Sequence, residues 1–200
     1  MTPERREKLL SVIKKRQNNL AVVLENVQDP HNISAVMRTC DAVGVQEVYV
    51  LNTRIPRHKK FGPRSSSSAA KWLSVLQFDN AEACFAELRK KYSRILTTHL
   101  ASDSIGLYQI DFTKSIALVF GNEHTGVSED IRRFADGNFL IPQVGIIRSL
   151  NISVACAVTL YEAYRQKQQA GHYDRNSLDG RHIEELIKAW DIHESQNDID

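Results

Sequence analysis

The stretch from Ile141 to Val158 reads IPQVGIIRSLNISVACAV. The end of a short strand and a proline lead through a turn into a helix with almost no polar face. A helix that is apolar all round is buried in a core or in an interface. Its entrance nevertheless carries Arg148, Ser149 and Asn151, whose polar groups are costly to bury without partners. Polar groups at the mouth of a buried helix indicate a ligand site.

Apolar runs and helical patterns alternate on either side of this stretch. The apolar runs predict short strands at 20–24, 48–51, 72–78, 95–98, 116–120 and 139–141. Apolar residues at helical spacing predict helices at 3–18, 33–43, 81–91, from 129, at 151–168 and at 183–190. We expect Asn32 to cap the second of these helices and Gly44 to end it. Strands that alternate with helices predict an α/β fold with a parallel sheet.

The composition predicts a folded cytoplasmic protein without a metal site. The 200 residues suit one domain with a substantial core, and 42% of them are hydrophobic. No apolar run reaches the roughly 18 residues of a membrane span, and the charged N-terminus lacks the apolar region of a signal peptide. Three scattered cysteines, without CxxC spacing or a histidine cluster, predict reduced thiols and no zinc ligands.

Basic residues are unevenly distributed, although the net charge is only +2. The region 52–71 is rich in proline, serine and basic residues and predicts a long loop. We expect phosphate contacts from Arg5, Arg6, Lys8, Lys15 and Arg16 near the N-terminus and from Arg165, Lys167 and Arg175 near the C-terminus. Clustered basic charge is the electrostatic footprint of nucleic-acid binding. The alternative is a solvated helix face plus a basic loop.

Three segments together resemble the motifs of one enzyme family. Residues 32–45, 118–128 and 141–158 are similar, in order and spacing, to the three motifs of the SpoU branch of the SPOUT RNA methyltransferases. The first segment has an asparagine and an arginine six positions apart, and the second contains the pattern G-x-E-x-x-G. The resemblance implies a parallel-sheet SPOUT fold with a deep C-terminal trefoil knot, in which residues 121–165 thread through a loop.

The same resemblance implies S-adenosyl-L-methionine (AdoMet) as the cofactor. Carried over by motif, the cofactor-binding residues are Thr98, Gly121, Ile141 and Leu150. Gly121 suits this role because a residue without Cβ lets a ligand approach the backbone. The alternative for Ile141 and Leu150 is that both are simply core residues.

The resemblance also implies that Asn32, Arg38, Glu123, Ser149 and Asn151 act in catalysis. Arg38 matches the arginine that activates a ribose 2′-OH. A guanidinium barely deprotonates, so we expect Arg38 to hold the hydroxyl and an adjacent phosphate, and Glu123 to orient Arg38 or Asn32. Ser149 and Asn151 would order the loop and the substrate. The alternatives are a surface ion pair of Arg38 with Asp41, helix caps for Asn32 and Ser149, and an exposed carboxylate for Glu123.

Segments outside the motifs, at 16–20, 29–32, 71–72 and 161–175, resemble the TrmH subgroup, which methylates a D-loop guanosine at tRNA position 18. We therefore expect a basic N-terminal helical extension at 1–19, a methyltransferase domain at 20–168, and a C-terminal helical extension at 169–200 with a disordered acidic tail. One alternative is a 2′-O-methyltransferase for ribosomal RNA or another tRNA position. The other is an inactive knotted RNA-binding protein.

The 151–168 helix also predicts a homodimer. Its apolar residues surround the helix, while one domain can bury only one face of it against a sheet. The resemblance implies a two-fold dimer packed through this helix, in which the same surface of both subunits meets. In the monomeric alternative, the apolar stripe of the final helix, Ile183, Leu186, Ile187 and Trp190, covers part of it.

Overall fold

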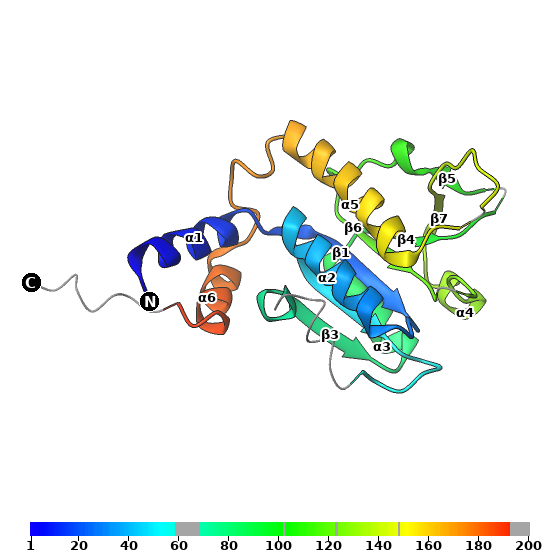
Figure 1. Cartoon of the computed structure of the whole chain (residues 1–200), viewed down its shortest axis with the longest axis horizontal. Helices are drawn as coiled ribbons and strands as arrows, with labels where there is room; N and C mark the ends of the chain where they lie inside the picture. The colour runs from blue at the N-terminus through cyan, green and yellow to red at the C-terminus, as the bar shows by residue number, and fades with distance from the viewer. Residues whose placement is uncertain (59–68, 102, 123, 148, 193–200) are drawn as a thin grey trace, which may run out of the picture.

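A sheet of seven parallel strands forms the centre of the computed structural model, which describes residues 1–58, 69–101, 103–122, 124–147 and 149–192. The strands are β1 (Gln17–Glu25), β2 (Val45–Leu51), β3 (Ser74–Phe78), β4 (Arg94–Thr98), β5 (Ile105–Gly106), β6 (Ile116–Phe120) and β7 (Gly137–Leu140). Their order is β3-β2-β1-β6-β4-β7-β5, and each neighbouring pair is parallel (Figure 1). The predicted α/β fold with a parallel sheet is therefore confirmed. The trefoil knot stays a prediction that rests on the resemblance.

Burial on both faces explains why the central strands have continuous apolar sequences. β1 and β6 pair from Leu20 opposite Ile116 to Leu24 opposite Phe120. Every residue of β6 is buried. Strands of a parallel sheet that is covered on both sides lack the alternation of half-exposed strands. The two apolar runs therefore predicted these strands correctly.

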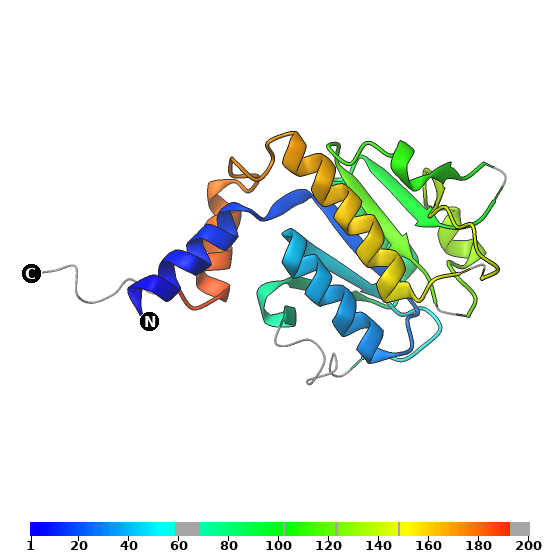
Figure 2. The same cartoon turned by 45° about the horizontal axis from the view of Figure 1, so that its top comes forward.

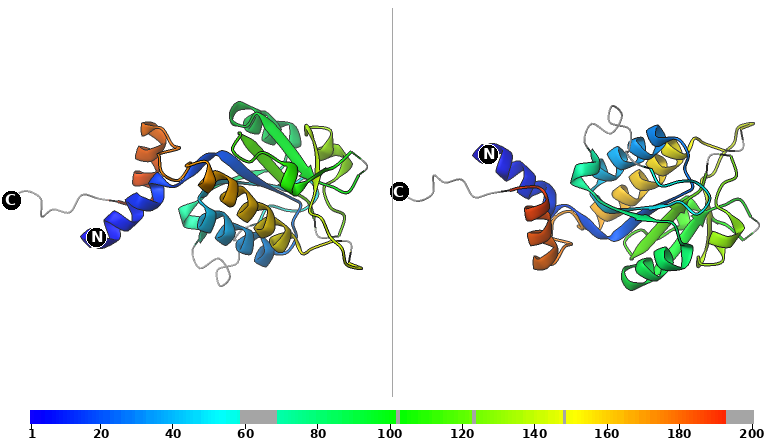
Figure 3. Two further views of the ribbon diagram at one scale, coloured as in Figure 1. Left: turned by 90° about the horizontal axis from the view of Figure 1, so that it is seen from above. Right: turned by 90° about the horizontal axis from the view of Figure 1, so that it is seen from below.

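Helices cover both faces of the sheet. The helices of the described residues are α1 (Pro3–Lys14), α2 (Pro30–Val43), α3 (Ala81–Lys91), α4 (Glu129–Arg132), α5 (Ile152–Gln169) and α6 (Gly180–Ala189), with short 3-10 helices η1 (Ala69–Trp72) and η2 (Leu107–Gln109). α2 and α5 lie side by side on one face, where they form the larger core cluster (Figure 3). α3 and α4 cover the other face. The carboxyl ends of the strands are left open to a site at one edge of this three-layered structure.

The terminal helices α1 and α6 pack on each other beside the sheet (Figures 1 and 2). Their small core contains Ile13, Leu186 and Trp190, and the Trp190 ring meets the Trp72 ring edge-on at 5.1 Å. The apolar stripe of α6 is therefore occupied by α1 and Trp72. It does not cover the outer side of α5, as the monomeric alternative required, and the homodimer stays a prediction.

Several predicted boundaries need correction. α2 begins at Pro30, because the Asp29 carboxylate accepts the His31 N–H at 2.8 Å and caps the helix. Asn32 therefore lies in the first turn and is not the cap. α1 ends at Lys14 instead of residue 18, and Trp72 lies in η1 instead of a strand. The left-handed Gly44, with φ of 81°, ends α2 as predicted.

The described residues contain no helix long and apolar enough to cross a membrane. Within the same part of the chain, no group of three His, Cys, Asp or Glu residues is arranged to hold a metal ion. Cys40, Cys84 and Cys156 are free and buried. Burial raises the pKa of the Cys84 thiol to about 12, so this group stays protonated and packs as a small apolar side chain. The predicted disordered tail, 193–200, lies outside the described residues.

Candidate active site

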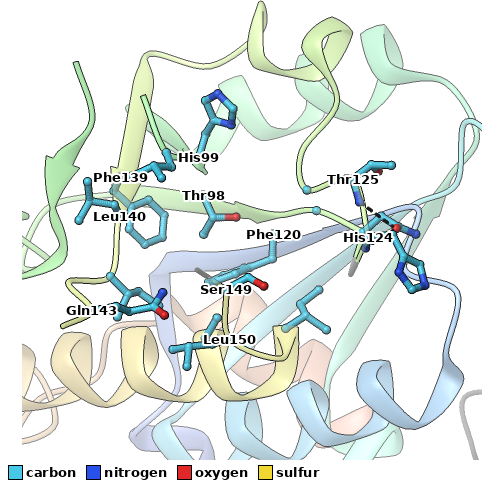
Figure 4. A pocket seen from close by; sticks show the side chains of 17 residues that line it. Thr98, His99, Phe120, His124, Thr125, Phe139, Leu140, Gln143, Ser149 and Leu150 are labelled. Carbon is cyan, nitrogen blue, oxygen red and sulfur yellow. Dashed lines mark hydrogen bonds between the residues drawn. The ribbon is translucent and has the colours of Figure 1, made fainter. Parts of the chain in front are cut away.

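A cleft of about 380 Å³ opens at the carboxyl ends of β4, β6 and β7, beside the start of α5 (Figure 4). Open α/β sheets bind ligands outside the carboxyl ends of their strands. The lining is mixed: apolar side chains such as Phe120, Leu140 and Leu150 alternate with polar ones such as Gln143. A concave site that combines apolar surface with placed polar groups is typical of small-molecule binding.

All four predicted cofactor-binding residues line this one cleft. Thr98 ends β4, Gly121 follows β6, Ile141 follows β7, and Leu150 precedes α5. The Thr98 hydroxyl donates to the Val119 carbonyl at 3.3 Å, which holds the side chain at the strand end. Leu150 is exposed, so its alternative as a plain core residue does not fit. Residues that lie far apart in the sequence thus converge on one cavity.

The loop after β6 forms one wall of the cleft. The Gly126 N–H donates to the Asn122 carbonyl at 2.9 Å, and the Asn122 carboxamide accepts the His124 N–H at 2.8 Å. A Cβ on Gly121 would lie 2.1 Å from the backbone of Gly126 and Val127. Glycine is therefore required for the closure of this loop upon itself. The expected reason, space for a ligand against the backbone, stays a prediction beside this contact.

A hydrogen bond joins two of the residues expected to act in catalysis. The Asn151 carboxamide nitrogen donates to the Asn32 Oδ1 at 3.2 Å, which links the first turns of α2 and α5. Asn151 also caps α5, because its Oδ1 accepts the Ser153 N–H at 2.8 Å. The helix cap is thus Asn151, and the alternative role of Ser149 as the cap is wrong. Ser149 instead lines the cleft.

Arg38 lies on the exposed side of α2. The alternative to a catalytic role was an ion pair with Asp41, but the Asp41 carboxylate accepts a hydrogen bond from the Arg16 guanidinium. Arg38 thus lies at the surface of the same helix that carries Asn32. Glu123, expected to orient these two residues, lies outside the described residues, as does Arg148.

Two of the predicted phosphate-binding residues are buried. The Arg16 side chain is fully buried between Asp41 and the Trp190 ring, whose centre lies 5.2 Å from the guanidinium carbon. The Lys167 ammonium is buried and donates to Asn19. Burial lowers the Lys167 pKa to about 8. The prediction that these two side chains bind RNA is therefore wrong. The other six, Arg5, Arg6, Lys8, Lys15, Arg165 and Arg175, keep access to solvent.

One polar pair beside the cleft was not predicted. His99 lines the cleft, and the Arg132 guanidinium donates to the His99 Nε2 at 2.8 Å. Arginine has no acceptor atom, so His99 Nε2 must carry the lone pair and Nδ1 the proton. The sequence carries no signal for this pair, because its members are 33 residues apart and belong to different elements.

Comparisons with known proteins agree with this geometry. Residues 19–161 match the family model described as the SpoU rRNA Methylase family. The tRNA (guanosine(18)-2'-O)-methyltransferase of Thermus thermophilus is 39% identical over 191 residues, which cover 94% of this chain and 96% of that protein. The crystal structure of the A. aeolicus TrmH/SpoU tRNA modifying enzyme has a TM-score of 0.86 and 36% identity, covering 96% of this chain and 98% of that one.

A more distant structure carries the cofactor. The SpoU methyltransferase AviRb from Streptomyces viridochromogenes, in complex with AdoMet, has a TM-score of 0.68 and 26% identity, covering 78% of this chain and 64% of that chain. The family model spans more than half of the present sequence, and it includes the segments 118–128 and 141–158, which contribute residues to the wall of the cleft. This chain belongs to the SpoU methylase family.

Proposed function

We propose that this protein transfers the methyl group of AdoMet to the ribose 2′-oxygen of guanosine 18 in tRNA. The observation that carries the proposal is the convergence of Thr98, Gly121, Ile141 and Leu150 on one cleft beside the Asn32–Asn151 pair. The likeness to a named tRNA (guanosine(18)-2'-O)-methyltransferase, which extends over 94% of the chain, supports the choice of nucleotide.

The cleft suits AdoMet in size and in chemistry. Its volume of about 380 Å³ lies within the roughly 300–1,000 Å³ of small-molecule sites. Phe120, Leu140 and Leu150 offer apolar surface for a nucleobase, and backbone groups at three strand ends offer hydrogen bonds for its polar edge. When bound, AdoMet supplies an electrophilic methyl group on a sulfonium. The protein must then align the ribose hydroxyl with that methyl group and exclude water.

Arg38 is the residue that holds and helps to activate the ribose 2′-hydroxyl in this proposal. An alcohol is a poor nucleophile, and its proton must leave during the transfer. The guanidinium of Arg38 stays charged, so it holds the hydroxyl and the adjacent phosphate by charge-assisted hydrogen bonds while the proton passes to a phosphate oxygen or to water. Asn32 and Asn151 order the ribose beside the cleft. Ser149 helps to order the loop and the substrate, and Glu123 orients Arg38 or Asn32.

We further propose that the working unit is a homodimer. Val154, Val158 and Tyr161 are exposed by 46%, 36% and 55%, and their i, i+4, i+7 spacing places them in one stripe along α5. Ile146 and Ile147, just before the helix, are exposed as well. Exposed apolar side chains gathered in a stripe on one helix mark an interaction site. A two-fold axis through α5 would cover the stripe of each subunit with that of the other.

The tRNA would be held by the six solvent-accessible basic residues of the terminal segments: Arg5, Arg6, Lys8, Lys15, Arg165 and Arg175. The logarithm of the tRNA binding constant falls linearly with the logarithm of the salt concentration, and each phosphate contact steepens this slope by roughly 0.7–0.9. Neutralising Arg165 and Arg175 together should therefore weaken tRNA binding and flatten this slope. Replacement of the buried Arg16 or Lys167 would act on folding instead.

The proposed function is tested by incubating the purified protein with labelled AdoMet and total RNA, followed by mapping of the methylated nucleotide. We expect label in tRNA, on the ribose of position 18. Label that appears only in ribosomal RNA, or at another tRNA position, would replace the proposed substrate by one of the alternatives. Binding of RNA without any transfer would identify an inactive RNA-binding protein.

A further inference from the structure

Asn26 is a buried residue of unusual backbone conformation directly after β1. Its φ is 49°, and among the described residues only Asn26 and Asp191 combine positive φ with a side chain. Asparagine tolerates this left-handed region better than most residues, because its short side chain can hydrogen-bond locally. Asn26 is only 6% exposed. The strained turn and the burial together raise the question of what its polar groups hold in place.

The side chain of Asn26 holds the segment that follows β2. Its Nδ2 donates to the Thr53 hydroxyl at 3.0 Å, and its Oδ1 accepts the Arg54 N–H at 2.9 Å. Its own N–H donates to the Leu51 carbonyl at 2.8 Å. Asn26 thus fixes the point where the chain leaves the sheet and enters the basic region 52–71. Arg57 follows three residues after Arg54, so this segment carries two cationic side chains at the surface.

The backbone carbonyl of Asn26, unlike its side chain, contacts the loop after β6 that lines the cleft. It accepts a hydrogen bond from the Asn122 Nδ2 at 2.8 Å. Asn122 in turn binds the amides of His124 and Gly126, and all three residues line the cleft. One residue therefore contacts both the basic segment and the cofactor loop.

Glu25 extends the same network to the start of α4. Its carboxylate is buried and accepts three hydrogen bonds: from the Ser128 N–H at 2.9 Å, from the Ser128 hydroxyl at 2.6 Å, and from the Asn26 Nδ2 at 3.2 Å. On the outside, Arg54 and Asp130 form an exposed ion pair at 3.3 Å, which contributes little by itself. The buried contacts are thus the ones that fix the two segments relative to each other.

We propose that Asn26 is a positioning residue that couples the basic segment 52–58 to the cofactor loop 121–126, so that bound RNA strengthens the binding of the cofactor and the reverse. The inference rests on the proposed function, because it takes the segment to face RNA and the cleft to hold AdoMet. A shift of the segment under an RNA phosphate is transmitted through Thr53 and Arg54 to Asn26, and through its carbonyl to Asn122. Coupling of this kind is reciprocal by thermodynamic linkage.

The test measures the coupling itself. S-adenosylhomocysteine, which carries no transferable methyl group, serves as the probe, and its Kd is measured by calorimetry with and without saturating tRNA. We expect tRNA to tighten the wild-type Kd by roughly 5- to 20-fold, within the usual range of allosteric coupling. Asn26→Gly keeps the left-handed backbone but removes the side chain, so the Kd ratio should fall to about 1. The Kd without tRNA should change far less, which separates lost coupling from a damaged cleft.

Two further variants control the test. Asn26→Asp retains an acceptor for the Arg54 N–H but loses the Nδ2 donor and brings a second carboxylate against Glu25, so it should also lose coupling. Asp191→Gly removes an exposed side chain at the other left-handed position, which follows the C-cap Trp190 of α6, and should keep the wild-type ratio. Hydrogen exchange gives a second readout: tRNA should slow the amides of 121–128 in the wild type and in Asp191→Gly, but not in the Asn26 variants.

The outcomes separate this inference from the function on which it rests. A Kd ratio in Asn26→Gly equal to that of the wild type, or a wild-type ratio of 1, would overturn the coupling even if the wild type methylates guanosine 18. Failure of the wild type to methylate any tRNA would instead sink the proposed function. Loss of the ratio in both Asn26 variants, with Asp191→Gly unchanged, supports the proposal.

Discussion

At the scale of single residues, we propose that the chemistry depends on polar groups that α2 and α5 present beside the cleft. The Asn32–Asn151 hydrogen bond fixes the two helix starts relative to each other. Arg38, on the same helix as Asn32, is exposed. The neighbouring carboxylate of Asp41 is engaged by the buried guanidinium of Arg16.

Arg38→Ala tests this assignment. We expect kcat to fall by on the order of 10²–10⁴-fold, because alignment of the hydroxyl and help with its proton are lost. The Kd for S-adenosylhomocysteine should stay within about twofold, since Arg38 is not among the residues that line the cleft. Arg38→Lys should also be poor, because an ammonium cannot reproduce the planar fork. Single-turnover kinetics with near-normal rates in either variant would remove Arg38 from the mechanism.

Lys167 gives a prediction about pH and stability. Burial lowers its pKa to about 8 from an ordinary value of 10.5. Between these values the unfolded chain binds more protons than the folded one, so this group makes the free energy of unfolding rise with pH, by at most about 1.4 kcal/mol per pH unit. Below about pH 8 Lys167 is protonated in both the folded and the unfolded chain, so its contribution to the free energy of unfolding no longer changes with pH. Denaturation of the wild type and of Lys167→Met from pH 7.5 to 10 should show the steeper rise in the wild type; equal slopes would contradict the buried ammonium.

At the scale of elements, patterns that are local in sequence were predictable. α3 and β6 have the predicted bounds, because a helical stripe and an apolar run each report on their own element. The burial of Arg16 was not predictable, since its partners Asp41 and Trp190 lie 25 and 174 residues further along the chain. A basic residue inside a basic cluster looks exposed until its tertiary neighbours are known. β5, only two residues long, carries too short a pattern to be recognised.

The loop after β6 gives a prediction at this scale. In Gly121→Ala the new Cβ would lie 2.1 Å from the Gly126 and Val127 backbone, so the loop must open. We expect a loss of cofactor affinity of at least tenfold together with a lower Tm, since overpacking costs about 1–3 kcal/mol or more. Gly145→Ala is the matched control, because a Cβ there meets nothing within 4 Å. Calorimetry and thermal unfolding that fail to distinguish the two variants would contradict the close contact.

At the scale of the whole molecule, the sequence left two alternatives for what covers the apolar surface of α5: a second subunit or the final helix. The sheet and α2 cover one side, and α6 packs elsewhere with α1. The stripe Val154, Val158 and Tyr161 is exposed, and we propose that a second subunit covers it. The fold class could be predicted from alternating strands and helices, whereas the strand order could not, because periodicity carries no information about which strands are neighbours.

Val158→Asp tests the proposed dimer. A charge in the centre of an apolar two-fold interface would be buried twice without a partner, so we expect the variant to have monomer mass by light scattering while the wild type has dimer mass. Tyr108→Asp is the control, because Tyr108 is also exposed at the surface but belongs to η2 and not to the exposed stripe of α5. If both variants keep the wild-type mass, α5 is not the interface.

The central claim is the transfer of a methyl group to one ribose oxygen. The most direct measurement compares two tRNA molecules that differ only at position 18, one with guanosine and one with 2′-deoxyguanosine, dG18. Both should bind with similar affinity, because the phosphates that meet the basic residues are unchanged. The account predicts incorporation of one methyl group per guanosine tRNA and none in the dG18 tRNA. Equal incorporation into both would place the methyl group on another atom and contradict the account.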